Sequence, residues 1–316
     1  MSEPIARAEL IGDRREAAVG EDFFRSRPFL DAEAATHTLR IEAADGVELL
    51  APLIVRPVGD GPEHDAISPY GYPGLAPPAS STVGAVLDPS TIDFSATGLV
   101  SVFLRHRLDA VPLSGASERN VVQVADPALP AKSRPSDRRQ VRRNLEAGYE
   151  LTLVPGGETT AVQRSGFLDL YEQTMRRTGA GAHYFFGAAY FDRVLEADRT
   201  WLALATAPGG GLAAASIAAV SDGYLHYYLS GSADSHLRDS PMKNVVARLV
   251  KHSTDLALPL NLGGGIAPGD PLEEFKRGFA NREHPWQTSE LVCDPEKYKL
   301  LSAGRDVGPF FPAYRA

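Results

Sequence analysis

The chain has 316 residues, of which 43% are hydrophobic and 23% are charged, and its formal net charge is −8. This length allows two domains of ordinary size, and the composition excludes a disordered or fibrous protein. The single cysteine, Cys293, excludes a disulfide within the chain and a zinc site built from cysteines. The acidic balance argues against non-specific coating of nucleic acid, although a local basic patch is compatible with RNA as a substrate.

The first residues carry charges of both signs and lack the apolar core of a signal peptide. The longest apolar run, residues 212–220, is far too short to span a bilayer. A lone cysteine also fits a reducing compartment. We therefore expect a cytoplasmic protein.

The chain up to about Asp126 is rich in predicted strands. Apolar alternation and β-branched residues predict a hairpin of strands 38–42 and 47–56, and further strands at 99–105 and 121–124. Residues 68–74, with the sequence Ser-Pro-Tyr-Gly-Tyr-Pro-Gly, form a predicted loop. Tyr70 and Tyr72 would present phenol groups on this stiff backbone, either along the wall of a substrate cleft or packed in a structural turn.

The proline-rich segment 126–137 is predicted to connect two domains, at residues 1–135 and 136–316. Ser136 is the expected N-cap of a helix over residues 137–147, which Gly148 would end. Four arginines of this helix lie at i,i+4 spacing, on two adjacent stripes. They would either contact the phosphates of a tRNA or form a solvated face: Arg138, Arg139, Arg142 and Arg143.

The remaining part of the chain has a clearer order of elements. After a strand at 149–154, helical spacing appears at 167–177 and 188–197, and then three strands follow as an antiparallel meander at 201–207, 212–220 and 224–230. A helix with a long apolar stripe at 240–256 and a short strand at 260–262 complete it. This order of elements is that of a GNAT acyltransferase core.

The segment that would bind coenzyme A in such a core departs from the expected pattern. An Arg-x-x-Gly-x-Gly sequence occurs at residues 176–181, but it follows a helix, whereas a pyrophosphate loop should follow the central strand and open the next helix. The segment in that place, residues 231–239, has one glycine and two aspartates, which would repel phosphate. We therefore expect no standard coenzyme A site.

The best candidate for chemistry is the run from residue 260 to 279. It contains Asn261, three glycines at 263–265, and the sequence Phe-Lys-Arg-Gly-Phe at 275–279. A lysine between two phenylalanines, Lys276, would be partly desolvated, and its cation would stabilise the oxyanion of an acyl transfer. The alternative is a surface lysine beside two core aromatics. Motifs of metal sites, serine hydrolases, ATPases and dehydrogenases are missing from the sequence, so we expect no metal and no bound cofactor.

Six segments now occur in one order: residues 68–74, the helix 138–148, Arg177 with the aromatics 184–186, Tyr-Leu-Ser-Gly at 228–231, Asn-Leu-Gly-Gly-Gly at 261–265 and the Phe-Lys-Arg-Gly-Phe sequence. Together they resemble the Fem-like branch of the GNAT superfold. The resemblance implies an α+β fold of two tandem GNAT-like domains, with mixed, mostly antiparallel sheets flanked by helices. It also implies transfer of an amino acid from aminoacyl-tRNA to an amine, with Lys276 assisting the acyl-transfer step.

We therefore expect an amide-forming acyltransferase whose acyl donor is a co-substrate, aminoacyl-tRNA, and whose acceptor is an amine of a small molecule or peptide. In the resemblance, Arg177 and Tyr184 line the acceptor site. The full set of expected substrate-binding residues is Arg177, Tyr184, Tyr70, Tyr72, Tyr228, Ser230 and Phe275. Two alternatives stay open, namely an N-acyltransferase that uses acyl-coenzyme A, and a catalytically silent module that binds a peptide or RNA. The oligomeric state and the general base also stay open.

Overall fold

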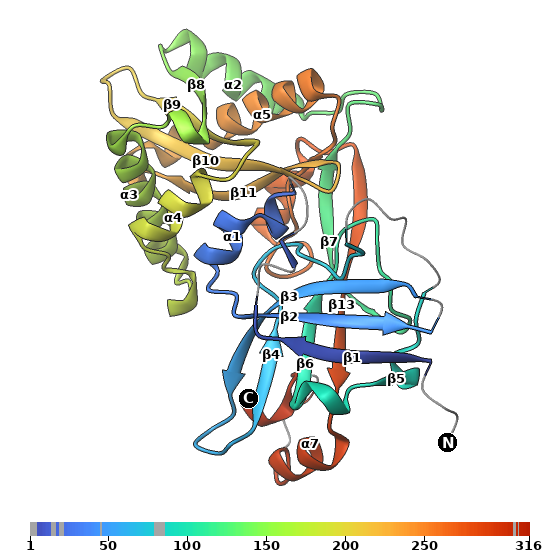
Figure 1. The fold of residues 1–316 in the computed structure, drawn as a ribbon. Coiled ribbons are helices and arrows are strands. Elements are labelled where there is room, and N and C mark those ends of the chain that lie inside the picture. Colours follow the sequence, from blue (N-terminus) through green and yellow to red (C-terminus); the bar gives the residue numbers. More distant parts are fainter. Residues whose placement is uncertain are drawn as a thin grey trace. The chain divides into compact units, whose positions relative to one another are not determined.

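The computed structural model describes residues 5–13, 17–18, 22–44, 46–78, 86–305, 308 and 310–316. By its contacts the chain divides into two compact units (Figure 1). Unit 1 comprises Met1–Gly20, Phe24–Arg119 and Pro285–Ala316, and unit 2 comprises Glu21–Phe23 and Asn120–His284. The chain enters unit 2 within strand β7 (Ser117–Ala125) and leaves it within strand β13 (Arg282–Val292). These units differ from the domains proposed at 1–135 and 136–316, because the last segment of the chain packs with the first.

Unit 1 is a mostly antiparallel sheet. Its strands are β1 (Ala6–Ile11), β2 (His37–Ala43), β3 (Glu48–Pro57), β4 (His64–Ile67), β5 (Ile92–Asp93), β6 (Leu99–Arg105) and β13, in the order β5-β1-β2-β3-β4-β6-β13. Among the described residues of these strands, β5–β1 and β4–β6 pair in parallel and the other neighbouring strands pair antiparallel. Unit 1 also contains helices α1 (Arg27–Ala32) and α7 (Pro295–Leu301). The predicted hairpin is confirmed as β2 and β3.

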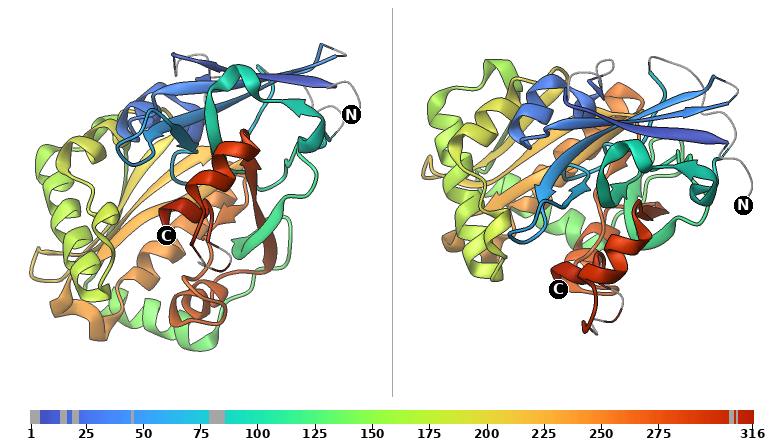
Figure 2. Two further views of the ribbon diagram at one scale, coloured as in Figure 1. Left: turned by 90° about the horizontal axis from the view of Figure 1, so that it is seen from below. Right: turned by 60° about the horizontal axis from the view of Figure 1, so that its bottom comes forward.

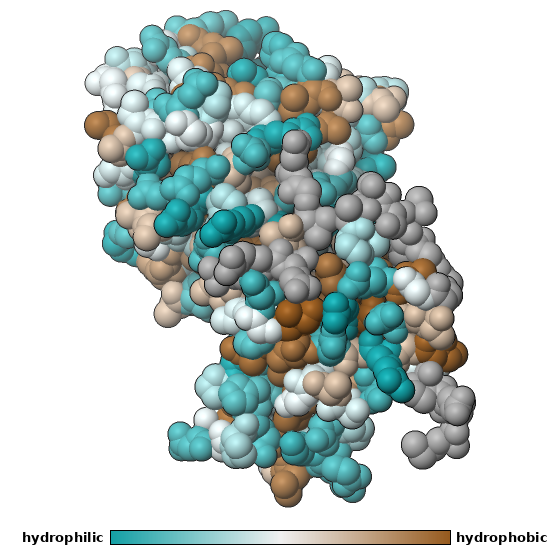
Figure 3. All heavy atoms as spheres, in the orientation of Figure 1, coloured by the Kyte–Doolittle hydropathy of each residue, from teal (hydrophilic) through white to brown (hydrophobic). Residues whose placement is uncertain are grey.

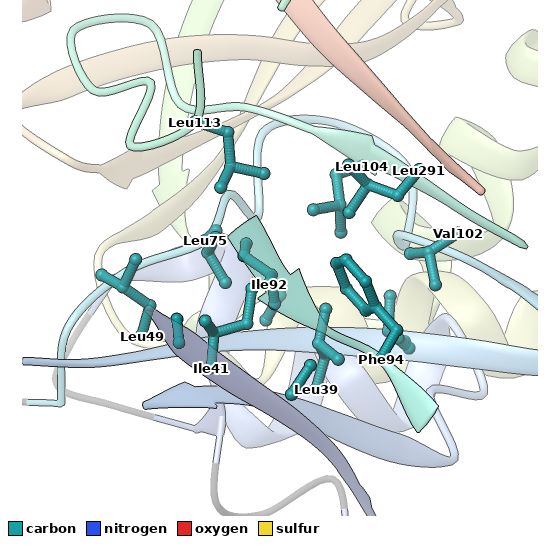
Figure 4. Close-up of a cluster of buried hydrophobic side chains, with 14 of the residues drawn as sticks. Leu39, Ile41, Leu49, Leu75, Ile92, Phe94, Val102, Leu104, Leu113 and Leu291 are labelled. Carbon is teal, nitrogen blue, oxygen red and sulfur yellow. The ribbon is translucent and has the colours of Figure 1, made fainter. Parts of the chain in front are cut away.

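The core of unit 1 lies on one face of these strands. Figure 4 shows Leu39 and Ile41 of β2, with Phe94, Val102 and Leu291, pointing toward a common centre. Each such side chain contributes about 1.5–3 kcal/mol when it is fully buried. Strand β1 was not predicted, because its inward-facing residues near the start are alanines, whose small side chains give a weak apolar alternation.

In the part of the chain that the structure describes, unit 2 contains six strands with helices on both faces. Its strands run in the order β7-β12-β11-β10-β9-β8, with β8 at Glu150–Pro155, β9 at Thr200–Thr206, β10 at Leu212–Ser221, β11 at Tyr224–Ser232 and β12 at Leu260–Asn261. Helices α3 (Ala161–Thr178) and α4 (Ala188–Leu195) cover one face, and α2 (Pro135–Glu146) and α5 (Met242–Leu256) the other (Figures 1 and 2). The predicted α+β fold class and the β9–β10–β11 meander are confirmed.

The main differences from the predicted elements lie at the starts of helices. Helix α2 begins at Pro135 with Arg134 as its N-cap, so the prediction of Ser136 as the cap is wrong. Proline fits the first helical position because its φ is preset and its missing N–H would have no partner there. Helix α3 begins earlier than expected, at a capping box in which Thr160 and Gln163 satisfy each other's backbone N–H groups. Helix α5 begins after Pro241.

Two irregularities of β11 shape the centre of unit 2. The β10–β11 register shifts between Ile217 and Ala218, which leaves Tyr228 as an extra residue on β11, a β-bulge. Strand β12 runs parallel to β11 but pairs with it only at Leu225–Leu260 and His226–Asn261. Beyond Asn261 the chain turns into three glycines, residues 263–265, which we call the triglycine segment. The bulge and this segment therefore both come after the residues at which β11 and β12 pair with each other.

Candidate active site

The position of Lys276 is set by the turn before its helix. Helix α6 (Pro271–Arg277) has Asp270 as its N-cap, and Asp270 Oδ1 accepts a hydrogen bond from the Glu273 N–H at 2.7 Å. The other oxygen, Oδ2, accepts from Ile266 N–H at 2.6 Å and from Ala267 N–H at 3.0 Å. One carboxylate thus fixes both the turn and the first turn of α6. Lys276 consequently lies in the last turn of a helix whose direction is rigidly held.

Lys276 is a buried cation beneath the triglycine segment. The residue is 8% exposed, and its Nζ donates a hydrogen bond to Gly264 O at 2.6 Å. Gly263 has a φ of +75°, and a Cβ there would lie 3.1 Å from Nζ, so glycine serves both the backbone turn and the close approach. Burial lowers the pKa of Lys276 from 10.5 to about 8, against the opposing effect of the Asp270 carboxylate. At neutral pH the side chain is still mostly an ammonium.

The triglycine segment is itself held by amide side chains of β7 and β12. Asn261 Oδ1 accepts from Gly263 N–H at 2.8 Å, and Asn120 Nδ2 donates to Gly265 O at 2.8 Å. A Cβ on Gly264 would lie 2.5 Å from Asn120 Nδ2, so this position has no room for a side chain. Backbone bonds continue the β7 ladder into the segment, since Gln123 N–H donates to Gly263 O at 3.1 Å. The carbonyl that contacts Lys276 therefore belongs to a fully tethered loop.

A second chain of contacts leads from Asn261 into the sheet. Asn261 Nδ2 lies 3.1 Å from His226 Nδ1, and His226 Nε2 lies 3.2 Å from Ser221 O. Burial lowers the pKa of His226 to about 4, so this imidazole is neutral at physiological pH. Sequence reasoning did not assign roles to His226, Asn261 or Asp270. The signal in the sequence was the position of Asn261, two residues before the first glycine of the Asn-Leu-Gly-Gly-Gly sequence.

Phe275, next to Lys276, packs inward. Its ring meets that of Phe279 edge-on, with centroids 5.7 Å apart, and it packs against the buried cluster beneath α5. Phe275 therefore packs against the hydrophobic core next to the lysine. Its predicted contact with substrate stays a prediction.

Tyr228 and Ser230 of β11 are engaged separately. The Tyr228 hydroxyl shares a hydrogen bond with that of Tyr190 on α4, and Phe186 stacks on Tyr190 with centroids 4.1 Å apart. Ser230 Oγ instead accepts from the Tyr227 hydroxyl at 2.6 Å, and burial raises the pKa of Tyr227 to about 12. Sequence reasoning missed Tyr190, because nothing local indicates that α4 approaches the bulge.

Tyr184 and Arg177 lie near the two ends of the α3–α4 connection. The Tyr184 carbonyl accepts from the Tyr171 hydroxyl at 2.7 Å, and its ring lies 4.1 Å from that of His183. Arg177, in the last turn of α3, forms an ion pair with Asp234 and donates to Ser232 O at 3.3 Å. The guanidinium thus ties α3 to the end of β11. These contacts leave the predicted acceptor role of both residues untested.

Tyr70 and Tyr72 belong to unit 1, whereas the other predicted substrate-binding residues belong to unit 2. The Tyr72 ring packs edge-on against Phe24 and Trp286, at 5.4 and 5.7 Å between centroids. Tyr70 is the exposed member of the pair, and its N–H donates to Glu33 Oε2 at 2.8 Å. The loop is therefore rigid and carries one exposed phenol and one packed phenol.

The basic helix α2 presents its arginines to solvent. Arg138, Arg139, Arg142 and Arg143 are all exposed, and over the described ranges neither Arg139 nor Arg143 forms an ion pair. The opposite side of α2 is fixed, because Asn144 Nδ2 donates to Asn244 Oδ1 at 2.7 Å. Hydrophilic side chains predominate over this end of unit 2 (Figure 3). The arrangement leaves one helix face available for an anionic partner.

The segment between β11 and α5 is closed by its own contacts. The Asp239 carbonyl accepts from Gln140 Nε2 at 3.0 Å and from Asn144 Nδ2 at 2.8 Å, and the Asp239 carboxylate accepts from the Tyr149 hydroxyl at 2.8 Å. Asp234 is paired with Arg177. Two carboxylates thus stand where a GNAT core would present N–H groups to a pyrophosphate.

In the described part of the chain, no group of three or more His, Cys, Asp or Glu side chains is placed to hold a metal ion. No helix within the same residues has both the length and the apolar character needed to cross a bilayer.

Comparisons with known proteins agree with this fold. A family model described as an acetyltransferase (GNAT) domain matches residues 131–277, and comparison with curated proteins finds no match. Among solved structures, FemX is 11% identical with a TM-score of 0.60, over 87% of this chain and 93% of FemX. L-PGS from Bacillus licheniformis is 12% identical with a TM-score of 0.56, over 84% of this chain and 90% of its own.

A third similar structure is the C-terminal DUF2156 domain of a putative lysylphosphatidylglycerol synthetase from Agrobacterium fabrum. It is 11% identical, with a TM-score of 0.57 over 91% of this chain and 93% of that one. At such identities the likeness establishes the fold. The predicted resemblance to Fem-like proteins of the GNAT superfold is confirmed at that level.

Proposed function

We propose that this GNAT-fold chain is an acyltransferase that forms an amide bond, transferring an aminoacyl group from aminoacyl-tRNA to an amine of a small molecule or peptide. The observation that carries the proposal is the buried Lys276 ammonium, fixed by a 2.6 Å hydrogen bond to Gly264 O under a glycine-only loop. A cation held in a low-dielectric site stabilises developing negative charge far better than one in water.

The role assigned to Lys276 follows from the bonds that form and break in the reaction. The acceptor nitrogen attacks the ester carbonyl carbon, a C–N bond forms, and the carbonyl oxygen becomes an oxyanion. The ester C–O bond then breaks, and the leaving ribose oxygen takes up the proton that the amine loses. Lys276 Nζ, with two N–H groups besides the one on Gly264 O, donates to the oxyanion or to the leaving oxygen. A pKa lowered to about 8 favours such proton donation near neutral pH.

Charged residues support aminoacyl-tRNA, and not acyl-coenzyme A, as the acyl donor. Phosphate groups of coenzyme A would meet Asp234 and Asp239 in the β11–α5 segment, and the Asp239 carbonyl is already occupied by α2. The exposed arginines of α2 instead offer a surface for the backbone of a tRNA. FemX and L-PGS share this fold, which is compatible with the same donor class.

The test uses charged tRNA and a panel of amino acids and peptides as acceptors, with amide product as the readout. Lys276→Met should lower kcat by about 10²–10³-fold, the loss seen when a transition-state donor is removed. Lys251→Met is the matched control, because Lys251 is an exposed lysine of α5 paired with Asp255, and it should retain wild-type turnover. Turnover by Lys276→Met within a few-fold of wild type would refute the proposal.

The coenzyme A alternative is tested in parallel by binding. Bulk charged tRNA, deacylated tRNA and acetyl-coenzyme A are titrated against the same protein. Preferential binding of charged tRNA is expected. Saturable binding of acetyl-coenzyme A alone would replace the aminoacyl-tRNA donor with an acyl-coenzyme A donor.

A further inference from the structure

A line of buried hydrogen bonds crosses two strands of unit 2 and ends at the triglycine segment. It runs from Ser221 O through His226 on β11 and Asn261 on β12 to the N–H of Gly263, with distances of 3.2, 3.1 and 2.8 Å. His226 is 2% exposed and Asn261 is 1% exposed. Water therefore cannot substitute for either partner without opening the sheet.

The chemistry of the partners fixes the direction of every bond in this line. Ser221 O can only accept, so His226 Nε2 carries the proton. In the neutral imidazole Nδ1 then accepts, so the Asn261 amide nitrogen faces it and donates. Asn261 Oδ1 is left to accept from Gly263 N–H, as its 2.8 Å distance indicates. The line has a single consistent proton arrangement, assigned from its partners, and thus a single orientation of the Asn261 side chain.

The orientation of Asn261 matters because this side chain holds the first residue of the triglycine segment. Gly263 N–H is held by Asn261, Gly263 O by Gln123 N–H, and Gly265 O by Asn120. The carbonyl between these anchors, that of Gly264, is the one that accepts from Lys276 Nζ. A rotation of the Gly263 peptide would move this acceptor away from the lysine.

We infer that His226 and Asn261 are positioning residues for acyl transfer: through Gly263 and Gly264 they fix where the Lys276 ammonium stands. The inference rests on the proposed function of Lys276. Neither residue contacts the lysine directly, so their effect is on its placement and its solvation. A pair that merely stabilised the β11–β12 contact would change the free energy of unfolding and leave the lysine as it is.

The charged groups around Lys276 are separate from this line. Asp270 faces it from the preceding turn and opposes the fall in its pKa, whereas Glu273 and Arg277 of α6 pair with each other. Asn120 and Gln123, from β7, are uncharged. A substitution of Asn261 by alanine therefore removes no charge near Lys276. Any change in its titration reports a change of position or hydration.

The experiment reads the Lys276 pKa directly, by NMR titration of protein labelled with ¹³C at the lysine Cε. Wild type should titrate near pH 8 at Lys276. In Asn261→Ala the loosened segment admits water, and the pKa should rise toward 10.5. In His226→Leu the pKa of Lys276 should also rise. In His226→Gln, whose carboxamide can both donate and accept a hydrogen bond, the pKa of Lys276 should stay close to the wild-type value.

Kinetics provide the second readout. Asn261→Ala should lower kcat by about 10–100-fold with little change in KM, as expected for a misplaced catalytic group. Thr200→Val is the matched control, because Thr200 is also buried in unit 2 and bonds the Ala197 carbonyl at 2.7 Å, away from the segment. It should lose stability but keep the wild-type kcat and lysine titration.

The outcomes separate this inference from the proposed function. An Asn261→Ala protein that is folded, with an unchanged Lys276 pKa and kcat, would overturn the positioning role. The same protein beside a fully active Lys276→Met would overturn the proposed function as well. If Asn261→Ala does not fold, His226→Leu and His226→Gln decide by the same titration, and equal pKa values in both would overturn the inference.

Discussion

Replacing Lys276 by methionine should inactivate the protein and also stabilise it. Burial lowers the pKa of this lysine from 10.5 to about 8, so the folded state disfavours its charge by about 3 kcal/mol, at 1.36 kcal/mol for each pKa unit. Methionine has nearly the same length and carries no charge. Its substitution leaves Gly264 O without a donor, which costs about 1 kcal/mol. The expected net gain at pH 7 is about 2 kcal/mol.

The gain should depend on pH in a defined direction. Below pH 8 the lysine is protonated in both the folded and the unfolded chain, so the full penalty applies. Between pH 8 and 10.5 the folded protein releases the proton while the unfolded chain keeps it, and wild-type stability rises with pH. The advantage of Lys276→Met should therefore shrink across this interval, and above it the variant should be slightly less stable than wild type.

Urea unfolding at pH 7 and at pH 10 measures this difference. Lys251→Met serves as the control, since its exposed pair with Asp255 contributes little at either pH. A Lys276→Met protein that is less stable than wild type at pH 7, or whose gain does not change with pH, would contradict the description of Lys276 as a desolvated ammonium. A gain together with lost turnover would show stability sacrificed for function at this site.

Three further predictions concern other parts of the chain. Gly231→Ala should destabilise unit 2 by about 1–3 kcal/mol in urea unfolding, because its Cβ would lie 2.4 Å from the main-chain carbon of Leu170; an unchanged midpoint would be inconsistent with this packing. Asp65→Asn should lower the free energy of unfolding by about 3–5 kcal/mol, since this fully buried carboxylate is paired with Arg315. A loss below about 1 kcal/mol would contradict a stabilising role of this ion pair. Arg143→Ala should weaken tRNA binding and reduce the slope of log affinity against log salt by about 1, whereas an unchanged slope would remove α2 from the interface.

The sequence predicted elements best where the apolar period is strong. The β9–β10–β11 meander and the apolar stripe of α5 are readable from the spacing of their apolar residues alone. Helix ends were less accurate, because competing caps lie within a residue or two of each other, as at Arg134 and Ser136. The assignment of the last segment to unit 1 could not be predicted, since it depends on which distant strand β13 joins.

Some residues of the candidate site could likewise be predicted from the sequence, and others could not. Lys276 was identified because its aromatic and glycine neighbours are contiguous in sequence. His226 and Asn261 belong to different strands, and only the parallel register of β11 and β12 brings them together. The Tyr190–Tyr228 contact likewise depends on how α4 packs on the sheet. Such pairings are tertiary facts, and no local pattern encodes them.

The most direct test of the central claim is single-turnover transfer from bulk charged tRNA to an amine acceptor, followed across pH for wild type and Lys276→Met. If the Lys276 ammonium is the group that assists transfer, the wild-type rate should fall as pH rises through about 8, where this side chain loses its proton. Lys276→Met should be slower by about 10²–10³-fold and should lack that limb. Transfer by Lys276→Met at the wild-type rate, with the same pH profile, would contradict the account.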